Sequence, residues 1–362
     1  MLASALDYAF DPALIASTPA SPRDHARLML VDRSAGTIAH HRVHDLPQFL
    51  GENDTLITNT TSVLRARLLL IRPASGTLTR IETEGLLQDP LPDGTWRALI
   101  RRASKFRAGE RLTLQDSRGI ESNDAIELLA RDDDAWIVRL HSAFDAATAL
   151  EHSGFTPIPP YILKARRDRA ITVDDTVDRA EYETVYADPS ERHSVAAPTA
   201  GLHFTPELLQ VLARRGVQRA DVLLHVGAGT FKPVEATTLE EHHMHSERIE
   251  IPASTIQTLQ HGDGARRRCV AVGTTAVRAI ESLPASWSAA DGAYRSNTQL
   301  LIQPGFGFRY TNALLTNFHL PRSTLLALVG AFMGMELLHE AYRVAVQERY
   351  RFYSFGDAML VV

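Results

Sequence analysis

The sequence predicts a mixed α/β fold (mixed α+β) that carries a smaller all-β unit, and two textures along the chain lead to this prediction. Beyond about residue 180, strand-like and helix-like segments alternate, which favours a mixed or parallel sheet with packed helices. Between about residues 65 and 140, short β-prone runs alternate with turn signals, as is typical of a small all-β unit. A chain of 362 residues suits two domains, or one large domain with an insertion.

The expected elements can be placed in order along the chain. The first 64 residues have mixed character, with strands expected near residues 27–32 and 55–58. Residues 156–161 contain three prolines and predict an extended connector. In the β-rich part, the expected strands are residues 66–71, 78–83, 95–100, 111–114 and 135–140. After residue 180, the expected strands are residues 221–226, 247–251, 269–272 and 300–302, and the expected helices are residues 206–215, 253–260, 274–283 and most of 324–349.

Composition excludes several classes of protein. The single cysteine, Cys269, can form no disulfide within the chain, and it excludes an iron–sulfur cluster held by several thiolates. No signal-peptide pattern occurs, and the longest apolar run, residues 325–335, is too short to span a bilayer. We therefore expect a cytoplasmic protein without a membrane partner.

Arginines are clustered although the net charge of -5 argues against unspecific binding to nucleic acid. Only Lys105, Lys164 and Lys232 are lysines. The basic runs are Arg101, Arg102, Lys105, Arg107 and Arg111; Lys164, Arg166, Arg167 and Arg169; and Arg266 to Arg268. Arginine binds phosphate bidentately and stacks on bases, but a charge run can equally be a solvated face.

The most informative stretch is residues 196–205. Its small residues predict a tight backbone path that brings His203 to the start of a helix. Thr205 suits the N-cap of that helix and Pro206 its first position. Such an arrangement is common in polar-ligand sites, and it is equally consistent with a structural loop whose histidine caps the helix.

Further segments place polar residues beside the ends of strands and helices. The candidates are His225, Gly227, Gly229 and Thr230; His242, His245 and Glu247; Thr274, Thr275 and Arg278; and Asn317, His319 and Arg322. The turn after His225 is not a dinucleotide fingerprint, because Lys232 occupies the place of the third glycine. The histidine-rich segment lacks the spacing of a helical zinc pair, which favours acid–base or hydrogen-bonding roles over a metal site. Four such polar segments suggest convergence on one cleft.

These motifs together resemble the S-adenosylmethionine:tRNA ribosyltransferase-isomerases, the enzymes of the queuosine pathway. The resemblance covers nearly the whole chain, and its most specific parts are residues 196–205, 225–233, 242–247, 272–278, 315–324 and 350–360. It implies a large domain of mixed sheet or barrel with packed helices, made of residues 1–64 and 155–362, and a small β-rich insertion domain of residues 65–154.

The resemblance also implies the reaction. The ribosyl part of S-adenosylmethionine moves onto the 7-aminomethyl-7-deazaguanine base at the wobble position of tRNA, the sugar becomes an epoxycyclopentane, and adenine and methionine leave. The sulfonium makes the C5′ hydrogens acidic and adenine leaves more easily when protonated, so the reaction needs a base and an acid. The substrates supply the nucleophile and the electrophile, so no metal and no further cofactor is expected. S-adenosylmethionine is a consumed co-substrate.

Roles follow from this resemblance. The residues expected to supply proton transfer and orientation are His203, His225, His242, His245 and Glu247. Those expected to bind S-adenosylmethionine or the acceptor are Thr199, Gly227, Gly229, Thr230, Thr274, Thr275, Arg278, Asn317, His319 and Arg322. Those expected to meet the phosphates of the tRNA anticodon arm are Arg101, Arg102, Lys105, Arg107, Lys164, Arg166 and Arg167. A monomer is expected.

The chain departs from the family pattern in residues 59–63 and 182–193. The usual Asn-Asp-Thr-Arg-Val is Asn-Thr-Thr-Ser-Val here, the usual Tyr-Gln-Thr contains Glu183, and His193 replaces a glycine. A paired loss of aspartate and arginine is tolerable if the two formed one ion pair. Two alternatives therefore stay open: a diverged paralogue that binds S-adenosylmethionine but modifies another acceptor, and a non-catalytic RNA-binding module.

Overall fold

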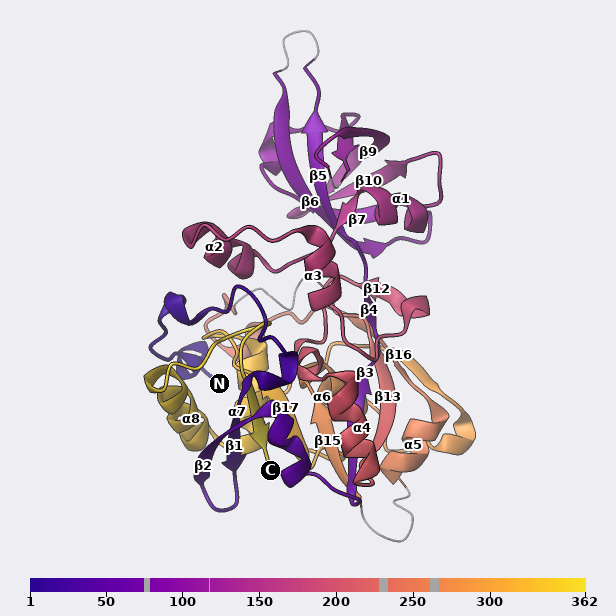
Figure 1. The fold of residues 1–362 in the computed structure, drawn as a ribbon. Helices are drawn as coiled ribbons and strands as arrows, with labels where there is room; N and C mark the ends of the chain where they lie inside the picture. The colour runs from indigo at the N-terminus through magenta and orange to yellow at the C-terminus, as the bar shows by residue number, and fades with distance from the viewer. Residues whose placement is uncertain (75–78, 117, 228–233, 261–266) are drawn as a thin grey trace.

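A nine-stranded mixed sheet forms the larger part of the molecule (Figure 1). The computed structural model describes residues 1–74, 79–116, 118–227, 234–260 and 267–362. In spatial order, the strands are β16 (Tyr294–Thr298), β14 (Glu247–Ile251), β13 (Gln218–Leu224), β3 (Asp54–Asn59), β15 (Arg268–Val272), β17 (Ala313–Asn317), β18 (Ala358–Val361), β1 (Arg27–Asp32) and β2 (Thr37–Arg42). The four neighbouring strands β13, β3, β15 and β17 are parallel, so their carboxyl ends lie along one edge of the sheet.

Both faces of this sheet are covered, which explains why the central strands β3 and β17 are buried along their whole length. In β15, Val270 and Val272 pack on one face with Leu208 and Leu212 of α4 (Pro206–Arg214). The other face carries the helices α6 (Thr274–Glu281), α7 (Thr324–Met333) and α8 (Met335–Gln347), where Ala271 belongs to the larger core cluster. A further helix, α5 (Ala253–Gln260), packs against β13.

The second sheet lies entirely between residues 67 and 155. Its strands are β5 (Arg67–Arg72), β6 (Ile81–Pro90), β7 (Trp96–Ile100), β8 (Arg111–Gln115), β9 (Glu121–Asp132), β10 (Ala135–His141) and β11 (Gly154–Phe155). Because β8 also pairs with β5, six of these strands close into a barrel around Leu68, Leu112 and Trp136. The barrel therefore belongs to the β-rich part, and the large sheet is open. The division into domains at residues 64/65 and 154/155 stays a prediction.

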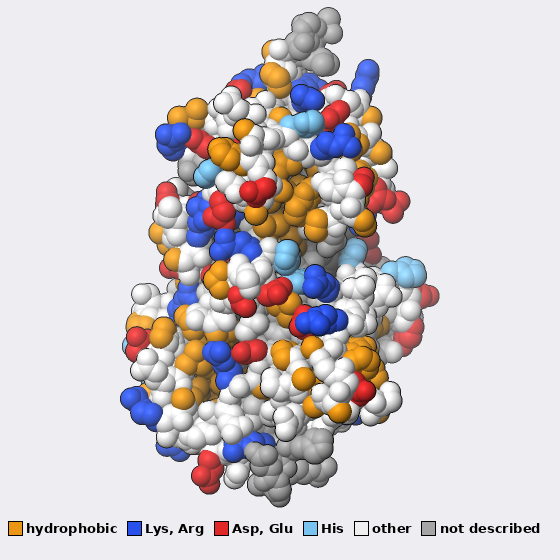
Figure 2. Space-filling model, turned by 90° about the vertical axis from the view of Figure 1, so that its right-hand side faces the viewer, with side chains coloured by type: hydrophobic (Ala, Val, Ile, Leu, Met, Phe, Trp, Pro, Cys, Tyr) orange, Lys and Arg blue, Asp and Glu red, His pale blue; other side chains and the backbone are white. Residues whose placement is uncertain are grey.

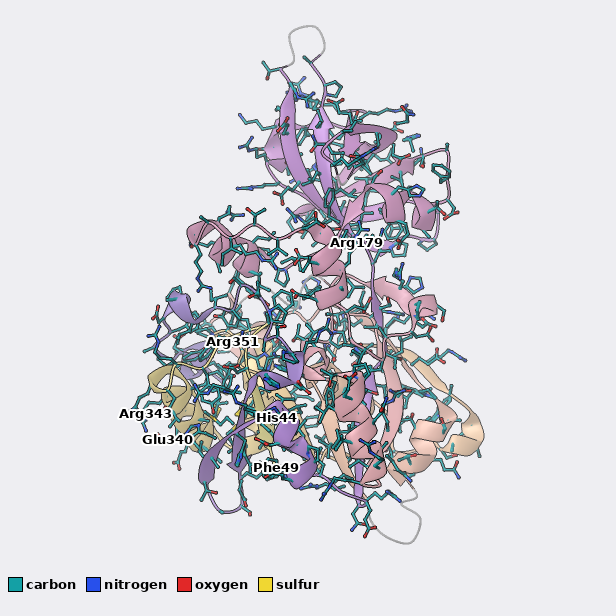
Figure 3. The ribbon with its side chains drawn as sticks, viewed as in Figure 1. His44, Phe49, Arg179, Glu340, Arg343 and Arg351 are labelled. Atoms are coloured by element: carbon teal, nitrogen blue, oxygen red, sulfur yellow. The ribbon has the colours of Figure 1, made fainter. Side chains whose placement is uncertain are left out.

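The two parts are joined by short elements that lie between them in Figure 1. These are β4 (Ser62–Val63), α2 (Pro160–Asp168), α3 (Asp175–Glu181) and β12 (Arg192–Ser194). The helix α1 (Ala146–Ser153) packs on the barrel, where Leu150 belongs to its core. Arg179 of α3 lies at this junction (Figure 3), where its Nε donates to Asp175 at 2.6 Å and its Nη2 donates to the carbonyl of Gly154 at 3.2 Å. The described 3₁₀ turns are Ala3–Leu6, Pro12–Leu14, Arg23–His25, Val43–Gln48, Ala103–Lys105, Pro189–Glu191, Thr199–His203, Leu239–Glu241 and Ala289–Asp291.

The predicted mixed α/β class is confirmed, and most predicted elements are found within a few residues. The strand expected at residues 300–302 is wrong: the strand is β16, and Thr298 Oγ1 accepts the Leu300 N–H instead of the ladder continuing. The connector at residues 156–161 ends early because Pro160 begins α2 as its first residue. The sequence analysis missed β9, whose polar residues alternate with buried Ile126 and Leu128.

No single helix in the described ranges is long and apolar enough to cross a membrane. Together α7 and α8 reach that length and composition, but they bend by 116° at their junction.

Candidate active site

A pocket opens at the carboxyl ends of the parallel strands, where loops from distant parts of the sequence meet. Residues after β15 and β17 form part of its wall, together with Val226 beyond the end of β13 and with Thr199 and Ala200, which begin the turn Thr199–His203. We call it the main pocket; it holds about 680 Å³ of space, open solvent included. Its lining residues are Tyr161, Ala196, Ala197, Pro198, Thr199, Ala200, Val226, Gly273, Thr274, Thr275, Thr316, Asn317, Phe318, His319, Leu320, Ser323, Leu325, Tyr353 and Ser354.

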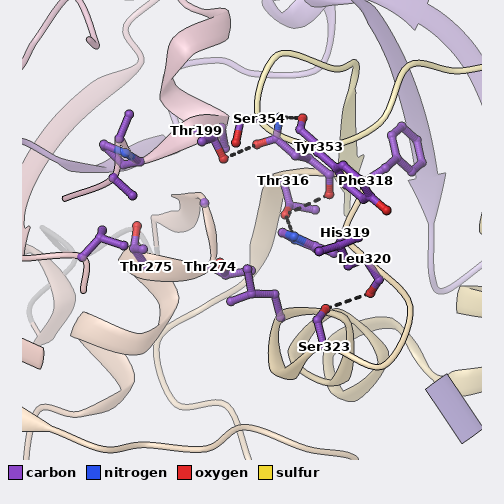
Figure 4. A pocket seen from close by; sticks show the side chains of 18 of the residues that line it. Thr199, Thr274, Thr275, Thr316, Phe318, His319, Leu320, Ser323, Tyr353 and Ser354 are labelled. Atoms are coloured by element: carbon purple, nitrogen blue, oxygen red, sulfur yellow. Dashed lines mark hydrogen bonds between the residues drawn. The ribbon is translucent and has the colours of Figure 1, made fainter. Parts of the chain in front are cut away.

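The pocket is held open by bonds between its own loops. Thr199 Oγ1 donates to Asn317 Oδ1 at 2.9 Å, and Asn317 Nδ2 donates to the Tyr353 carbonyl at 3.1 Å. Two segments more than a hundred residues apart are thereby tied to β17. Figure 4 shows Thr275 on one side of the pocket and His319 and Ser323 on the opposite side.

One wall is the first turn of α6. Gly273 has φ +89°, a conformation that favours glycine, and its N–H donates to the Leu315 carbonyl at 2.8 Å. This turn brings Thr274 and Thr275 to the pocket, where the hydroxyl of Thr275 is buried and finds no hydrogen-bond partner among the described residues. A helix N-terminus with an unused hydroxyl suits a polar ligand group such as a ribose hydroxyl.

His319 is the histidine of the main pocket. Burial lowers its pKa to about 3, so the ring is neutral near pH 7. Its Nε2 lies 2.8 Å from Thr316 Oγ1, and Thr316 Oγ1 also lies 3.3 Å from the Asn317 carbonyl. When Thr316 donates to that carbonyl, it accepts from Nε2–H, which leaves the lone pair on Nδ1.

A second hollow adjoins the main pocket, and we call it the side pocket. It is lined by His242, Met244, His245, Glu247, Arg278, Thr324 and Leu325, and it holds about 320 Å³, open solvent included. Leu325 lines both hollows. Glu247 and Arg278 form a buried ion pair there, and Glu247 Oε1 also accepts the Gly227 N–H at 3.2 Å. Burial lowers the pKa of His242.

His225 directly precedes Val226 of the main-pocket wall and does not itself line the main pocket. Its Nδ1 is 3.1 Å from Thr61 Oγ1, which is 2.6 Å from Ser194 Oγ, and Ser194 Oγ accepts the Val226 N–H at 2.9 Å. Burial lowers the pKa of His225 to about 4, with smaller contributions from His193 and Arg248. Its buried Nε2 makes no hydrogen bond in the described part of the chain, but it lies 3.8 Å from Glu191 Oε2.

Comparisons with known proteins agree with this architecture. A family model described as "Queuosine biosynthesis protein" matches residues 3–361. This chain belongs to the queuosine biosynthesis protein family. The S-adenosylmethionine:tRNA ribosyltransferase-isomerase of Rubrobacter xylanophilus is 44% identical over 358 residues, covering 99% of this chain and 96% of the relative. That of Thermotoga maritima is 41% identical over 362 residues, covering 100% of both. A crystal structure of the S-adenosylmethionine tRNA ribosyltransferase from Thermotoga maritima aligns with a TM-score of 0.54 and 33% identity, covering 99% of this chain and 100% of the other.

The resemblance drawn from the motifs is therefore confirmed, and the residues that depart from the queuosine biosynthesis family pattern can be located. Ser62 Oγ and the Val63 N–H donate to Glu183 Oε2 at 2.8 and 3.1 Å. Burial raises the pKa of Glu183, and its Oε1 is buried without a hydrogen-bond partner among the described residues. His193 packs edge-on against His225 with ring centroids 5.1 Å apart. The departures thus lie next to the carboxyl end of β3.

The structure separates His203 from both pockets, which corrects its expected place in the site. Its Nδ1 lies 3.0 Å from the Ala200 carbonyl and its Nε2 lies 3.1 Å from the Gly356 carbonyl. Because both ring nitrogens face backbone oxygens in a buried setting, the ring ties the turn Thr199–His203 to the loop before β18. This arrangement favours a structural loop, although His203 does not cap the helix as that alternative expected. Thr205 caps α4 as expected, accepting the Leu208 N–H.

Several other candidates stand apart from the pockets. Arg322 is exposed and lines neither hollow, and its carbonyl accepts the Val234 N–H. Gly229 and Thr230 lie outside the described residues. No group of three or more His, Cys, Asp or Glu that could hold a metal occurs in the ranges that the structure describes.

The basic residues assigned to tRNA divide into two kinds. Arg101, Arg102, Lys105 and Arg107 follow β7 on the barrel and are exposed, as are Arg167 and Lys164, the latter paired with Asp168 at 2.6 Å. The expectation that Arg166 meets a tRNA phosphate is wrong. Arg166 is 5% exposed and donates to both carboxylate oxygens of Asp178 at 2.7 Å, so no donor face is left for a phosphate. On the face in Figure 2, basic and acidic side chains are interspersed over both parts.

Pocket residues that the sequence analysis missed come mainly from two segments, 160–162 and 352–355. Tyr161 and Tyr353 have ring centroids 4.8 Å apart at the pocket wall. Tyr353 has φ +70°, a conformation that is strained for a non-glycine residue and is common at functional sites. Only the family resemblance could have pointed to these tyrosines, because isolated aromatic residues usually belong to a core.

Proposed function

We propose that this chain transfers and isomerises the ribosyl group of S-adenosylmethionine onto the 7-aminomethyl-7-deazaguanine base of tRNA, releasing adenine and methionine. The observation that carries the proposal is the meeting of the motif segments 196–200, 273–275 and 316–320 in one pocket, in a chain whose family matches from residue 3 to residue 361. Family membership alone records ancestry; the shared pocket supplies a place where the chemistry can occur.

The main pocket would hold the adenosyl half of the donor. Tyr161 and Tyr353 supply aromatic walls that suit both a purine ring and a sulfonium cation. Thr274, Thr275 and the N–H groups of α6 would bind the ribose hydroxyls. Thr199 and Asn317 would shape the site, since they bond to each other across it.

His319 would take the proton from C5′ of the donor. It lies in the main pocket, it is neutral at working pH, and Thr316 can hold the tautomer with a lone pair on Nδ1. His225 would deliver the proton that adenine needs to leave, acting through the small imidazolium fraction that a pKa of about 4 leaves at pH 7 and returning to the neutral form; its Nε2 lies 3.8 Å from Glu191 Oε2. His203 would be structural.

The exposed Arg101, Arg102, Lys105 and Arg107 of the barrel, with Lys164 and Arg167 of α2, would position the tRNA by its phosphates. Residues 65–154 would then act as an inserted tRNA-binding domain. A monomeric, cytoplasmic enzyme without metal or iron–sulfur cluster is part of the same proposal.

A second candidate is a paralogue that acts on a different acceptor. Ser62, Glu183 and His193 favour it, because they replace a family arginine, glutamine and glycine beside His225. A non-catalytic RNA-binding module has less support, since such a module has no use for a pocket of this chemistry.

The test is turnover with purified protein, labelled S-adenosylmethionine and tRNA that carries the aminomethyl-deazaguanine base. Adenine and methionine should be released together, with modified tRNA formed. The matched control is the same tRNA with guanine at the wobble position. Donor binding without turnover would favour the paralogue, and a salt-sensitive RNA complex without donor affinity would favour the binding module.

A further inference from the structure

The side pocket contains a charged side chain with an uncommitted donor. Arg278 is 5% exposed; its Nη1 bonds Glu247 and its Nε donates to the Leu300 carbonyl at 3.1 Å. Its Nη2 is buried and has no hydrogen-bond partner among the described residues. A buried, charged donor without a hydrogen-bond partner destabilises a fold, and a ligand that accepts from this donor would explain why the chain retains it.

The surroundings of this donor favour an anionic group. Thr324 and Leu325 form the first turn of α7, a ten-residue helix whose positive end therefore faces the side pocket. Among the residues that the structure describes, the N-cap Ser323 Oγ accepts only the Leu326 N–H, so the first N–H groups of the helix remain for a ligand. A carboxylate placed here would accept from Arg278 Nη2, from the Thr324 hydroxyl and from the helix backbone.

The side pocket also contains groups that suit a cation and an apolar chain. Glu247 supplies a carboxylate, and the neutral imidazole of His242 supplies an acceptor, both suited to an ammonium group. Met244 and Leu325 supply apolar surface. A carboxylate, an ammonium and a short apolar chain together make an α-amino acid.

We propose that the side pocket is the subsite for an α-amino-acid zwitterion, and, resting on the proposed function, that it holds the methionyl end of S-adenosylmethionine. Because Leu325 lines both hollows, the donor would lie across it, with its adenosyl half in the main pocket. Glu247 and His242 then bind substrate, and they leave proton transfer to His319 and His225.

The experiment compares three ligands by calorimetry on the intact protein without tRNA: S-adenosylmethionine, its decarboxylated analogue, and 5′-methylthioadenosine, which lacks the amino acid. The decarboxylated analogue lacks the carboxylate and its charge-assisted hydrogen bonds, so its affinity should be about 10- to 150-fold weaker than that of S-adenosylmethionine.

Two variants test the assignment without breaking the buried pair. Arg278→Lys keeps the positive charge but lacks Nη2, and Thr324→Val removes only a hydroxyl. Each should reduce the discrimination between the two sulfonium ligands by several-fold and leave 5′-methylthioadenosine binding unchanged. The matched control is Thr275→Val in the main pocket, which should weaken all three ligands alike. Melting temperatures report folding.

Equal affinity of wild-type protein for the two sulfonium ligands would overturn the inference, as would equal losses for all three ligands in the side-pocket variants. Because binding is measured without turnover, these results are separate from the proposed function, which fails only if no adenine is released with acceptor tRNA.

Discussion

Replacing His319 by glutamine tests the proposed base of the main pocket. The glutamine amide can still reach Thr316 in place of Nε2, so the wall of the pocket should persist. The lone pair on Nδ1 is lost. Removing a general base typically lowers turnover by about 10²–10⁴-fold, and we expect a loss in this range with donor affinity nearly unchanged.

The pKa of about 3 also sets the pH dependence. At pH 7 only about one molecule in 10⁴ carries imidazolium at His319, so turnover should show no acid limb near pH 6.5 from this residue. Because the folded-state pKa lies below the unfolded value of about 6.5, protonation lowers stability as the pH falls from 6.5 toward 3. At pH 5 this cost is about 2 kcal/mol, and His319→Gln should abolish it.

The assays are turnover from pH 5 to 9 with labelled donor, and urea denaturation of both proteins at pH 5 and pH 8. Thr316→Val is the matched control: it removes the partner of Nε2 and should lower turnover by about tenfold, less than the loss of the ring. His319 is not the base if His319→Gln keeps its turnover. Its low pKa is disproved if wild-type turnover shows an acid limb near pH 6.5 that the variant lacks.

The remaining predictions concern residues on which sequence and structure disagree or depart from the family. His203→Ala should lower the free energy of unfolding by about 3 kcal/mol, since it leaves a cavity and removes the one ring N–H that donates to a backbone carbonyl, with normal turnover per folded molecule; lost turnover at unchanged stability would contradict this. Arg166→Ala should destabilise by about 3–5 kcal/mol in urea titrations, because a buried carboxylate loses its partner, and should leave the tRNA affinity of the folded protein unchanged. Arg102→Ala should leave the stability unchanged but weaken tRNA binding, reducing the slope of log affinity against log salt concentration by about 1. Burial raises the pKa of Glu183 above its unfolded value, so the wild type loses stability as the pH rises from the unfolded pKa through the folded pKa. Glu183→Gln should therefore lose less melting temperature between pH 4 and pH 8. Identical profiles of melting temperature against pH would disprove the burial of this carboxyl group.

Much of the fold could be predicted because its signals are local. The strand β15 is a short apolar run bounded by a glycine, and α4 carries its own N-cap and a glycine at its end. The strand β9 was not predicted because polar residues alternate with its buried ones, so that the segment contains no continuous apolar run. Closure of the barrel through β5 and β8 could not be predicted, because it pairs Leu70 with Leu114 and such a distant pairing leaves no local pattern.

The candidate site divides in the same way. The loops that carry chemistry can be recognised from local sequence, since small residues, helix caps and polar side chains at strand ends are properties of neighbouring residues. Which of those side chains meet follows from the packing of the folded chain. This packing brought Thr199, Thr275 and His319 to one pocket through the parallel order of the strands, and it turned the donors of His203 and Arg166 inward. Whether a polar group meets a ligand or a buried partner depends on contacts between distant segments, and these exist only once the chain has folded.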